Sequence, residues 1–315
     1  MQIQGLGEQG ILQMLQRFCP AELVGDDGAV LEAGLVVTTD LLVDGVHFSD
    51  RTTPGYSAGW RAAAANLSDL AAMGANPVAI TVGLALRGDT PVTWLEELYR
   101  GIHDCLQPYG TVIVGGDVCR SPVNTVAITA LGKVLPGRVI QRSAAQVGDA
   151  IVITGNHGLS RAGLELLLHP EKFPGLNPQQ SLIATTAHQQ PRPRLDVLPY
   201  LHGRVAGMDS SDGLADAVIQ ICRASGVGAM INHLPIPPVL VEMVGLAGAI
   251  DWVLYGGEDF ELVLCLPLAP AKALIQKLGN GAAIIGNINS NTGVMLGIDQ
   301  APPRQLDLSA GFQHF

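Results

Sequence analysis

The chain has 315 residues, of which 48% are hydrophobic and 15% are charged. This length favours two domains, and the apolar content is high enough for packed cores, which excludes an intrinsically disordered chain. The 28 acidic residues outnumber the 18 lysines and arginines, so the net charge is −10. Because the sequence contains no basic stripe, we expect no nucleic-acid partner.

We expect a cytoplasmic protein that has no membrane partner. The longest apolar candidate, 62–86, is interrupted by Asn66, Ser68, Asp69 and Pro77, and a span needs about 18 apolar residues. The start, Met-Gln-Ile-Gln-Gly, places no basic segment before an apolar core, so no secretory signal is predicted. The five cysteines never occur as CxxC, which predicts free thiols rather than disulfides or a zinc site.

Helix and strand patterns alternate through the first half of the chain. An alanine-rich helix is predicted to end at Gly74, and Pro77 forbids its continuation. The predicted helices are 11–18, 57–73 and 94–106, and the predicted strands are 35–39, 78–86, 111–114 and 126–134. This alternation is typical of one domain that contains both helices and strands.

A polar connection at 138–148 is flanked by glycines, and we place a domain boundary there, giving domains 1–140 and 141–315. The second half begins a new strand at 150–154. The elements predicted after it are a helix following Gly158, a strand near Val205, a helix at 214–224, and strands near Leu262 and Ile284. The segment 170–193 is predicted to be an irregular surface excursion.

Carboxylates close several of the predicted strands. Asp40 ends Val-Val-Thr-Thr-Asp, Asp117 ends Ile-Val-Gly-Gly-Asp, and Asp209 and Asp212 follow Val-Ala-Gly-Met. The other acids of interest are Asp26 and Asp27 in Gly-Asp-Asp-Gly, Asp69 three residues after Asn66, and Glu258 and Asp259 after two glycines. Glycine lets backbone approach a ligand closely, and ligands of open α/β sheets gather beyond the strand ends.

Converging carboxylates would repel one another by several kcal/mol in a partly buried site. Ligation by Asp, Thr, Ser and water oxygens suits Mg²⁺ or Ca²⁺, and Mg²⁺ usually completes its shell with water and substrate phosphates. The pattern therefore predicts several metal ions that hold a polyphosphate such as ATP. Any single Gly-Asp is also typical of a turn or a helix cap, but five such clusters favour a site.

Other nucleotide-binding motifs are excluded or left open. The GxGxxG match at 5–10 has too few residues before it for the required strand, and no GxxxxGK[ST] motif occurs. The run Gly155-Asn-His-Gly158-Leu-Ser160 suits either an anion cradle at a helix start or a tight strand-to-helix turn. The sequence does not decide between these two interpretations.

The order of the acidic motifs resembles that of the thiamine-monophosphate kinase family. The matching segments are Gly25-Asp-Asp-Gly-Ala29, Thr38-Thr-Asp40, Asp44-Gly-Val-His47-Phe48, Asn66-Leu-Ser-Asp69-Leu-Ala-Ala-Met-Gly-Ala75, Gly115-Gly-Asp117, Asp209-Ser-Ser-Asp212-Gly-Leu214 and Gly256-Gly-Glu-Asp-Phe-Glu261. The wider superfamily includes aminoimidazole ribonucleotide synthetase. The resemblance implies an α/β (α+β) fold with an N-terminal dimerising mixed-sheet domain and a C-terminal α/β sandwich.

The resemblance also implies transfer of the ATP γ-phosphoryl group to thiamine monophosphate, with several Mg²⁺ ions. The implied metal ligands are Asp27, Thr38, Thr39, Asp40, Asp69, Asp117, Asp209 and Asp212. The implied ATP contacts are Gly116, Asp117, Arg142 and Ser211, and the implied thiamine contacts are His47, Glu258 and Phe312. Asp117, Arg142 and Asp212 are the implied catalytic residues, with Arg120 a rival to Arg142. A homodimer paired through N-terminal strands is implied, and the weakly charged stretch 78–86 permits it.

Two alternatives stay open at this stage. One is a sister reaction in which ATP activates an amide or a selenide, although Cys19 lacks the glycine-rich setting of a selenophosphate synthetase. The other is a catalytically silent protein that binds nucleotide or metal through the same ligands.

Overall fold

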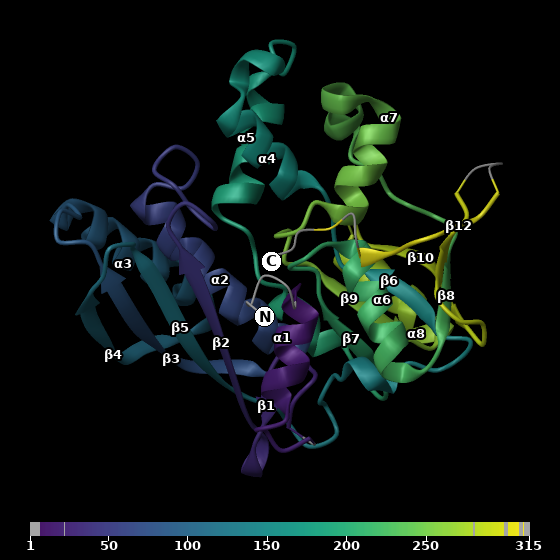
Figure 1. The fold of residues 1–315 in the computed structure, drawn as a ribbon. Coiled ribbons are helices and arrows are strands. Elements are labelled where there is room, and N and C mark those ends of the chain that lie inside the picture. The colour runs from purple at the N-terminus through teal and green to yellow at the C-terminus, as the bar shows by residue number, and fades with distance from the viewer. Residues whose placement is uncertain (1–6, 22, 280, 299–301, 309–310, 312–315) are drawn as a thin grey trace.

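The computed structural model describes residues 7–21, 23–279, 281–298, 302–308 and 311. Two mixed sheets lie side by side, the first formed by the N-terminal half of the chain and the second by the C-terminal half (Figure 1). The last strand of the first sheet ends at Lys133 and the first strand of the second begins at Ala150. The predicted boundary at 140/141 falls between them.

The first sheet has the strand order β1-β2-β5-β3-β4. Only β3 and β4 pair in parallel, and the other neighbours are antiparallel. The strands are β1 (Ala29–Val30), β2 (Leu35–Val43), β3 (Asn76–Leu86), β4 (Val112–Arg120) and β5 (Thr125–Lys133). Because β3 lies between β5 and β4, the stretch 78–86 cannot offer a free edge to a second chain, and that part of the expectation is wrong. The edge strands of this sheet are β1 and β4.

Helices cover one face of this sheet, and β5 accordingly alternates between buried and less buried side chains. On β5, Val126, Ile128 and Ala130 are buried, and they share a core with α2 and α3. The helices of this half are α1 (Gly7–Gln16), α2 (Gly55–Ala72) and α3 (Val92–Leu106), with 3-10 turns η2 (Glu32–Gly34) and η3 (Gln107–Tyr109). The predicted helices and strands of the first half are confirmed in kind. However, β2 continues to Val43 and β4 to Arg120, so Asp40 and Asp117 lie within their strands and do not end them as predicted.

The second sheet has the order β12-β11-β8-β10-β6-β9-β7. Its strands are β6 (Ala150–Ile153), β7 (Ala206–Asp209), β8 (Gly228–Ile231), β9 (Leu262–Leu266), β10 (Ala283–Asn289), β11 (Val294–Leu296) and β12 (Arg304–Gln305). Its helices and turns are α4 (Leu159–Leu168), α5 (Pro178–Gln189), α6 (Leu214–Ser225), α7 (Pro238–Tyr255), α8 (Leu268–Leu278), η4 (Arg142–Ala144), η5 (Pro170–Lys172) and η6 (Leu195–Tyr200).

One apolar core connects the two halves. It contains Val36 and Ile128 from the first sheet together with Val152 and Leu264 from the second. Between the sheets runs α2, whose small side chains are buried on nearly every side and whose residues contact β2, β5, β7 and η6. A helix that is apolar around its whole circumference is one that the fold encloses.

The segment 170–193 is not an irregular excursion, and this prediction is wrong. It contains α5, which begins with a capping box between Asn177 and Gln180 and has Pro178 in its first turn. These signals are present in the sequence. However, α5 has no continuous apolar face, so the spacing of its apolar residues does not indicate a helix. The helix packs against α4, and together they project at the top of Figure 1.

The helical segment α5 and the chain that follows it are tied to the first half by side-chain-to-backbone hydrogen bonds. Trp60 Nε1 donates to Pro191 O at 2.8 Å, and Gln189 Nε2 donates to Thr52 O at 2.7 Å. These bonds hold the base of the α4–α5 hairpin against the N-terminal half.

Within the described part of the chain, α7 has the length and composition of a membrane span, so the statement that no segment reaches that length is wrong. Its helical geometry is interrupted at Gly245, whose φ is 70° and ψ is 172°. Its buried residues include Ala249, Val253 and Leu254, and the helix contacts α4 and α6. A core helix of a soluble protein passes the same test of length and composition, so this observation is weak evidence for a span.

Two glycines allow α2 and α3 to approach closely. A Cβ atom added to Gly59 would lie 1.9 Å from Leu98 O, and one added to Gly101 would lie 1.9 Å from Tyr56 O. We expect Gly59→Ala to lower the free energy of unfolding by about 2 kcal/mol, because the overpacking penalty exceeds the helix propensity gained with alanine. Chemical denaturation measures this change.

The matched control is Gly175→Ala, because a Cβ atom at Gly175 would meet no atom within 4 Å. We expect this variant to unfold like the wild type. A Gly59→Ala protein with wild-type stability would contradict the packing argument.

Candidate active site

Three carboxylates from different elements converge where the two halves meet. Asp27 lies in the loop before β1, Asp69 on α2, and Asp209 at the end of β7. Each offers an oxygen atom, and these atoms all lie within 4.8 Å of one another. The structure therefore brings together three of the predicted metal ligands, two from the first half and one from the second.

Asp40 on β2 belongs to the same group. Burial raises the pKa of Asp69 well above its usual range, and the charges of Asp40, Asp209 and Asp27 raise it further. Burial and the charge of Asp27 likewise raise the pKa of Asp40. We call Asp27, Asp40, Asp69 and Asp209 the carboxylate cluster. Its members repel one another because they share a space that is largely closed to water.

Neutral hydroxyl groups position two members of the cluster. Thr38 Oγ1 donates to Asp69 Oδ2 at 2.5 Å. Ser68 Oγ donates to Asp209 Oδ2 at 2.7 Å, and both of those side chains are buried. Ser211 Oγ donates to the other oxygen of Asp209 at 3.1 Å. These bonds fix the carboxylates in place, but they do not cancel the charge.

Arg142 supplies positive charge to one side of the cluster. Its guanidinium donates to Asp27 Oδ1 at 2.7 Å and to Gln220 Oε1 at 2.6 Å, and its backbone N–H donates to Asp26. Burial still raises the pKa of Asp27 to about 7 against the opposing effect of Arg142. One guanidinium therefore does not compensate the cluster.

The cluster suits a hard divalent cation. All of its potential ligand atoms are oxygens, as Mg²⁺ requires. Asp27 Oδ2 is buried and has no hydrogen-bond partner among the described residues, which leaves an acceptor atom for an ion. A bound cation would remove both the repulsion and the unsatisfied acceptor.

Thr39 and Asp117 are not brought to the cluster within one chain. Successive residues of a strand face opposite sides, so Thr39 lies on the other face of β2 from Thr38 and Asp40. Its hydroxyl pairs with Thr129 Oγ1 at 2.8 Å. Asp117 is exposed on β4, three strands away from β2. At about 4.8 Å per strand, the two strands are roughly 14 Å apart.

The remaining predicted phosphate contacts lie on β4 and after β7. Gly116 lies beside β3, where a Cβ atom would come within 1.9 Å of Val82 O, so only glycine fits. Ser211 and Asp212 lie two and three residues after the buried Asp209, and Asp212 is exposed. The two segments that carry these residues therefore belong to different halves of the chain.

The loop between α7 and β9 holds a strained backbone. Glu258 and Phe260 have φ values of 58° and 51°, a region that residues other than glycine adopt at a cost of about 1–3 kcal/mol. Several contacts impose this conformation. Glu258 N donates to Ser211 O at 2.6 Å, and Phe260 is buried. The loop that carries Glu258 is thus fixed to the loop that carries Ser211.

Asp259 decides the open question about the turn at 155–160. Gly158 N donates to its Oδ2 at 2.6 Å and Ser160 N donates to its Oδ1 at 2.9 Å, so this carboxylate caps the start of α4. Burial raises the pKa of Asp259 to about 7. The N-terminus of α4 binds an anion, but that anion is a side chain of the same protein.

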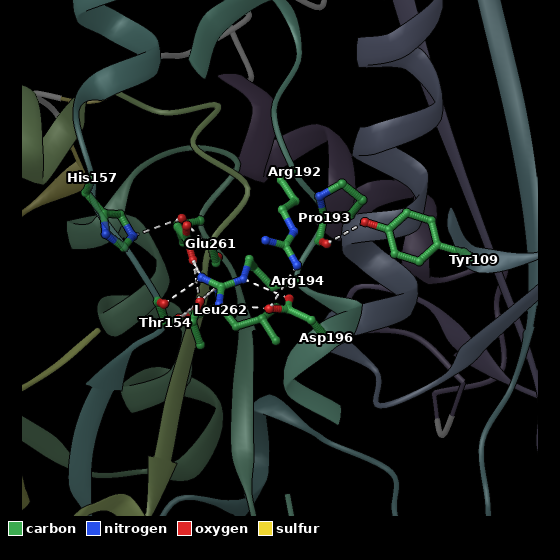
Figure 2. A network of polar contacts seen from close by, with 10 residues as sticks. Tyr109, Thr154, His157, Arg192, Pro193, Arg194, Asp196, Glu261 and Leu262 are labelled. Carbon is green, nitrogen blue, oxygen red and sulfur yellow. Dashed lines mark hydrogen bonds and ion pairs between the residues drawn. The ribbon is translucent and has the colours of Figure 1, made fainter. Parts of the chain in front are cut away.

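Glu261 ends the loop in a buried ion-pair network (Figure 2). Arg194 Nη1 donates to Glu261 Oε2 at 2.5 Å, and Thr154 Oγ1 donates to the same oxygen at 2.6 Å. Tyr109 at the end of η3 donates to Pro193 O at 3.2 Å, which ties this segment to the first half. The network holds the end of the Glu258 loop.

Of the other two predicted thiamine contacts, the structure describes only His47. His47 lies between β2 and α2, and its Nδ1 accepts a hydrogen bond from Val43 N at 3.1 Å. Phe312 lies outside the described residues. Arg120 is on exposed β4 near Gly88, whereas Arg142 contacts the carboxylate cluster. Of the two rival arginines, Arg142 is therefore the one that the structure places at the cluster.

Sequence reasoning missed Ser68 and Arg61. Both lie on α2 in an alanine-rich stretch and are buried. A buried arginine needs a partner of opposite charge or a hydrogen-bond acceptor. An arginine within a predicted apolar helix therefore indicates a buried polar contact, and this signal was present in the sequence. Ser68 adjoins Asp69, and the helix brings both side chains to the cluster.

Comparisons with known proteins identify the family of this chain. Residues 25–134 match the N-terminal domain of AIR synthase related protein, and residues 146–298 match its C-terminal domain. A thiamine-monophosphate kinase from Synechococcus elongatus is 53% identical to this chain, with 98% of this chain and 97% of the relative covered. The chain belongs to the thiamine-monophosphate kinase family.

Other members of the family support the same placement. The thiamine-monophosphate kinase from Escherichia coli K12 is 35% identical, over 93% of this chain and 91% of the relative. The solved structure of AaThiL complexed with AMPPCP and TMP has a TM-score of 0.84 and 28% identity, covering 100% of this chain and 99% of that one. The predicted two-domain architecture is confirmed.

A metal-binding cluster predicts a link between cation concentration and stability. Asp69→Asn removes one of the repelling charges while keeping an acceptor for Thr38. We expect the metal-free variant to be as stable as the wild type or more stable by about 1 kcal/mol. We expect Mg²⁺ to stabilise the wild type by about 3 kcal/mol at a hundredfold excess over its Kd, and the variant by much less. Thermal unfolding with EDTA or Mg²⁺ measures both quantities.

The control is Asp89→Asn, because Asp89 is exposed and pairs with Arg87 at the surface. This variant should respond to Mg²⁺ like the wild type. Equal responses of Asp69→Asn and the wild type would argue against a cation at the cluster.

Proposed function

We propose that this protein transfers the γ-phosphoryl group of ATP to thiamine monophosphate, forming thiamine diphosphate and ADP. The observation that carries the proposal is the carboxylate cluster, which draws oxygen ligands from both halves and leaves its charge uncompensated. The family supports the substrates, since its relatives are thiamine-monophosphate kinases. The related AaThiL structure is a complex with AMPPCP and TMP.

In this proposal Asp27, Asp40, Asp69 and Asp209 hold Mg²⁺ ions, together with Thr38, Thr39, Asp117 and Asp212. When bound, Mg²⁺ neutralises phosphate charge and orients the phosphates. Gly116, Asp117, Arg142 and Ser211 contact ATP. His47, Glu258 and Phe312 contact the thiamine part of the acceptor.

The chemistry asks for positioning rather than for a strong base. A phosphate oxygen of thiamine monophosphate is already ionised near pH 7, so it attacks the γ-phosphorus directly, and the bond to the β-phosphate oxygen breaks as ADP leaves. Arg142 presents its guanidinium to the transferring phosphoryl group. Asp117 and Asp212 act near the phosphates of ATP. Ser68 and Thr38 keep the carboxylates in fixed orientations during the transfer.

The proposal includes a homodimer whose partner completes the site. Among the described residues, β4 pairs only with β3, and β1 covers β2 only at Val36 and Val37. If β4 of one chain lies alongside β2 of the other, Gly116 and Asp117 come next to Thr39 and Asp40. This arrangement explains why these residues lie about 14 Å apart within one chain. We also propose a cytoplasmic location, which the free cysteines support.

Turnover distinguishes this function from a silent binder and from a sister reaction. We expect the purified protein to make thiamine diphosphate from ATP and thiamine monophosphate with Mg²⁺, and none with EDTA. Asp40→Asn should lower kcat by about a hundredfold, since a ligand of the cation is lost. Near-wild-type turnover of Asp40→Asn at saturating substrates would contradict the role of the cluster, and Asp89→Asn is the control.

A mixed dimer tests whether Asp117 acts in the partner's site. A heterodimer of Asp40→Asn and Asp117→Asn chains, purified through two different tags, contains one undamaged site if Asp117 crosses the interface. It should regain about half of the wild-type activity, although each parent homodimer keeps only a small fraction of that activity.

The matched control is a heterodimer of Asp40→Asn and Asp69→Asn chains. Both changes affect the carboxylate cluster of their own chain, so both sites are damaged and no activity should return. An inactive Asp40→Asn/Asp117→Asn heterodimer would show that each chain supplies its own Asp117.

A further inference from the structure

Arg61 on α2 is a buried cation that contacts two separate parts of the second half. Its side chain is 2% exposed. Nη1 donates to His188 O at the end of α5 at 2.7 Å, and Nη2 donates to Glu258 Oε1. Arg61 therefore joins the central helix, the α4–α5 hairpin and the loop of Glu258.

One carboxylate oxygen of Glu258 is hydrogen-bonded, while part of the side chain is exposed. Its Oε1 is bonded to Arg61, while its side chain is 36% exposed. Its backbone is in the left-handed region, with φ of 58°, and its N–H is bonded to Ser211 O. A carboxylate held in this way presents its remaining surface in one direction.

We propose that Arg61 is a positioning residue that orients the Glu258 carboxylate toward the cationic heteroaromatic ring of the phosphate acceptor. This inference rests on the proposed function, because it assigns Glu258 to the acceptor. The fork of the guanidinium reaches two acceptors at once, and a lysine ammonium lacks that planar geometry. Arg61 acts on the acceptor through Glu258 and touches neither reacting phosphate.

The surroundings of Arg61 do not compete for Glu258. Burial and the charge of Arg61 lower the pKa of His188 to about 3, so its ring stays neutral. His188 Nδ1 lies 3.3 Å from Ser160 Oγ and 3.5 Å from Arg61 Nη1. In the described part of the chain, the ion-pair partner of Arg61 is Glu258.

The sign of one kinetic change separates positioning from simple electrostatics. Arg61 carries a positive charge close to the carboxylate that faces a cationic ring. If charge alone mattered, removing Arg61 would strengthen the attraction of Glu258 for the cation and lower the KM for thiamine monophosphate. If Arg61 orients Glu258, removing it would raise that KM.

The experiment uses Arg61→Met and Arg61→Lys in the full-length enzyme. We expect Arg61→Met to raise the KM for thiamine monophosphate about tenfold, with little change in the KM for ATP, because a charged hydrogen bond is lost on the acceptor side. Arg61→Lys should show a smaller rise. A lowered or unchanged KM for thiamine monophosphate in Arg61→Met would overturn the proposal.

A double-mutant cycle shows whether the effect passes through Glu258. Glu258→Gln should itself raise the KM for thiamine monophosphate. Adding Arg61→Met to Glu258→Gln should then cause little further change. If the effect of Arg61→Met persists in full in the Glu258→Gln protein, Arg61 acts by another route and the proposal fails.

Hydrogen exchange tests the positioning without turnover. We expect the peptide that covers 256–261 to exchange faster in Arg61→Met than in the wild type, without substrate present. Unchanged exchange there would overturn the proposal. If the wild type fails to phosphorylate thiamine monophosphate, the proposed function fails, and this measurement still judges the positioning of the loop.

The matched control is Arg204→Met, which removes another ion pair with a buried acid, Asp149, at 2.6 Å. Arg204→Met should lower the free energy of unfolding, but it should not raise the KM for thiamine monophosphate relative to the KM for ATP. If Arg61→Met does not fold, Arg61→Lys and Glu258→Gln carry the same comparison. A selective rise of that KM in Arg204→Met would show that general destabilisation explains the effect.

Discussion

Mutual repulsion among buried carboxylates is the constraint on which the rest of this structure depends. Asp27, Asp40, Asp69 and Asp209 come from four separate segments, and burial raises the pKa of each. A fold that pointed them at solvent would avoid this cost. The surrounding hydroxyl groups, Arg142 and the packed helix α2 instead hold them together. This arrangement is expected where bound cations supply the missing positive charge and in turn attract a polyphosphate.

The loop that carries Glu258 is held in one conformation although it belongs to no sheet. The Glu258 loop is held by its backbone bond to Ser211, by Asp259 at the start of α4, by Arg61 and by the Arg194 pair with Glu261. Each anchor comes from a different element. The loop consequently tolerates two non-glycine residues with positive φ, because no single contact has to impose the strained conformation.

Sequence reasoning identified the four clustered acids because Asp27 stands beside Gly28 and because all four lie in motifs that resemble those of the family. Asp27, Asp40, Asp69 and Asp209 meet as expected. Alternation along a strand already places Thr39 on the opposite face from Thr38 and Asp40. The sequence could not show that Asp117 lies far from the cluster, because long-range pairing decides the strand order. The helix α5 was missed because its apolar residues do not recur with a helical period, although its capping residues are present. Arg61 was missed because its partners lie far away along the chain.

The buried position of α2 has a consequence for how the protein can be divided. Its residues pack against both sheets, and the core that contains Val36 also contains Leu264. The two halves form separate sheets, but the stability of each half depends on its packing against the other. A fragment that ends in the connection between the sheets would expose the side of α2 that faces β7 and would keep an incomplete cluster. Folding of the two halves and assembly of the carboxylate cluster are therefore coupled to each other.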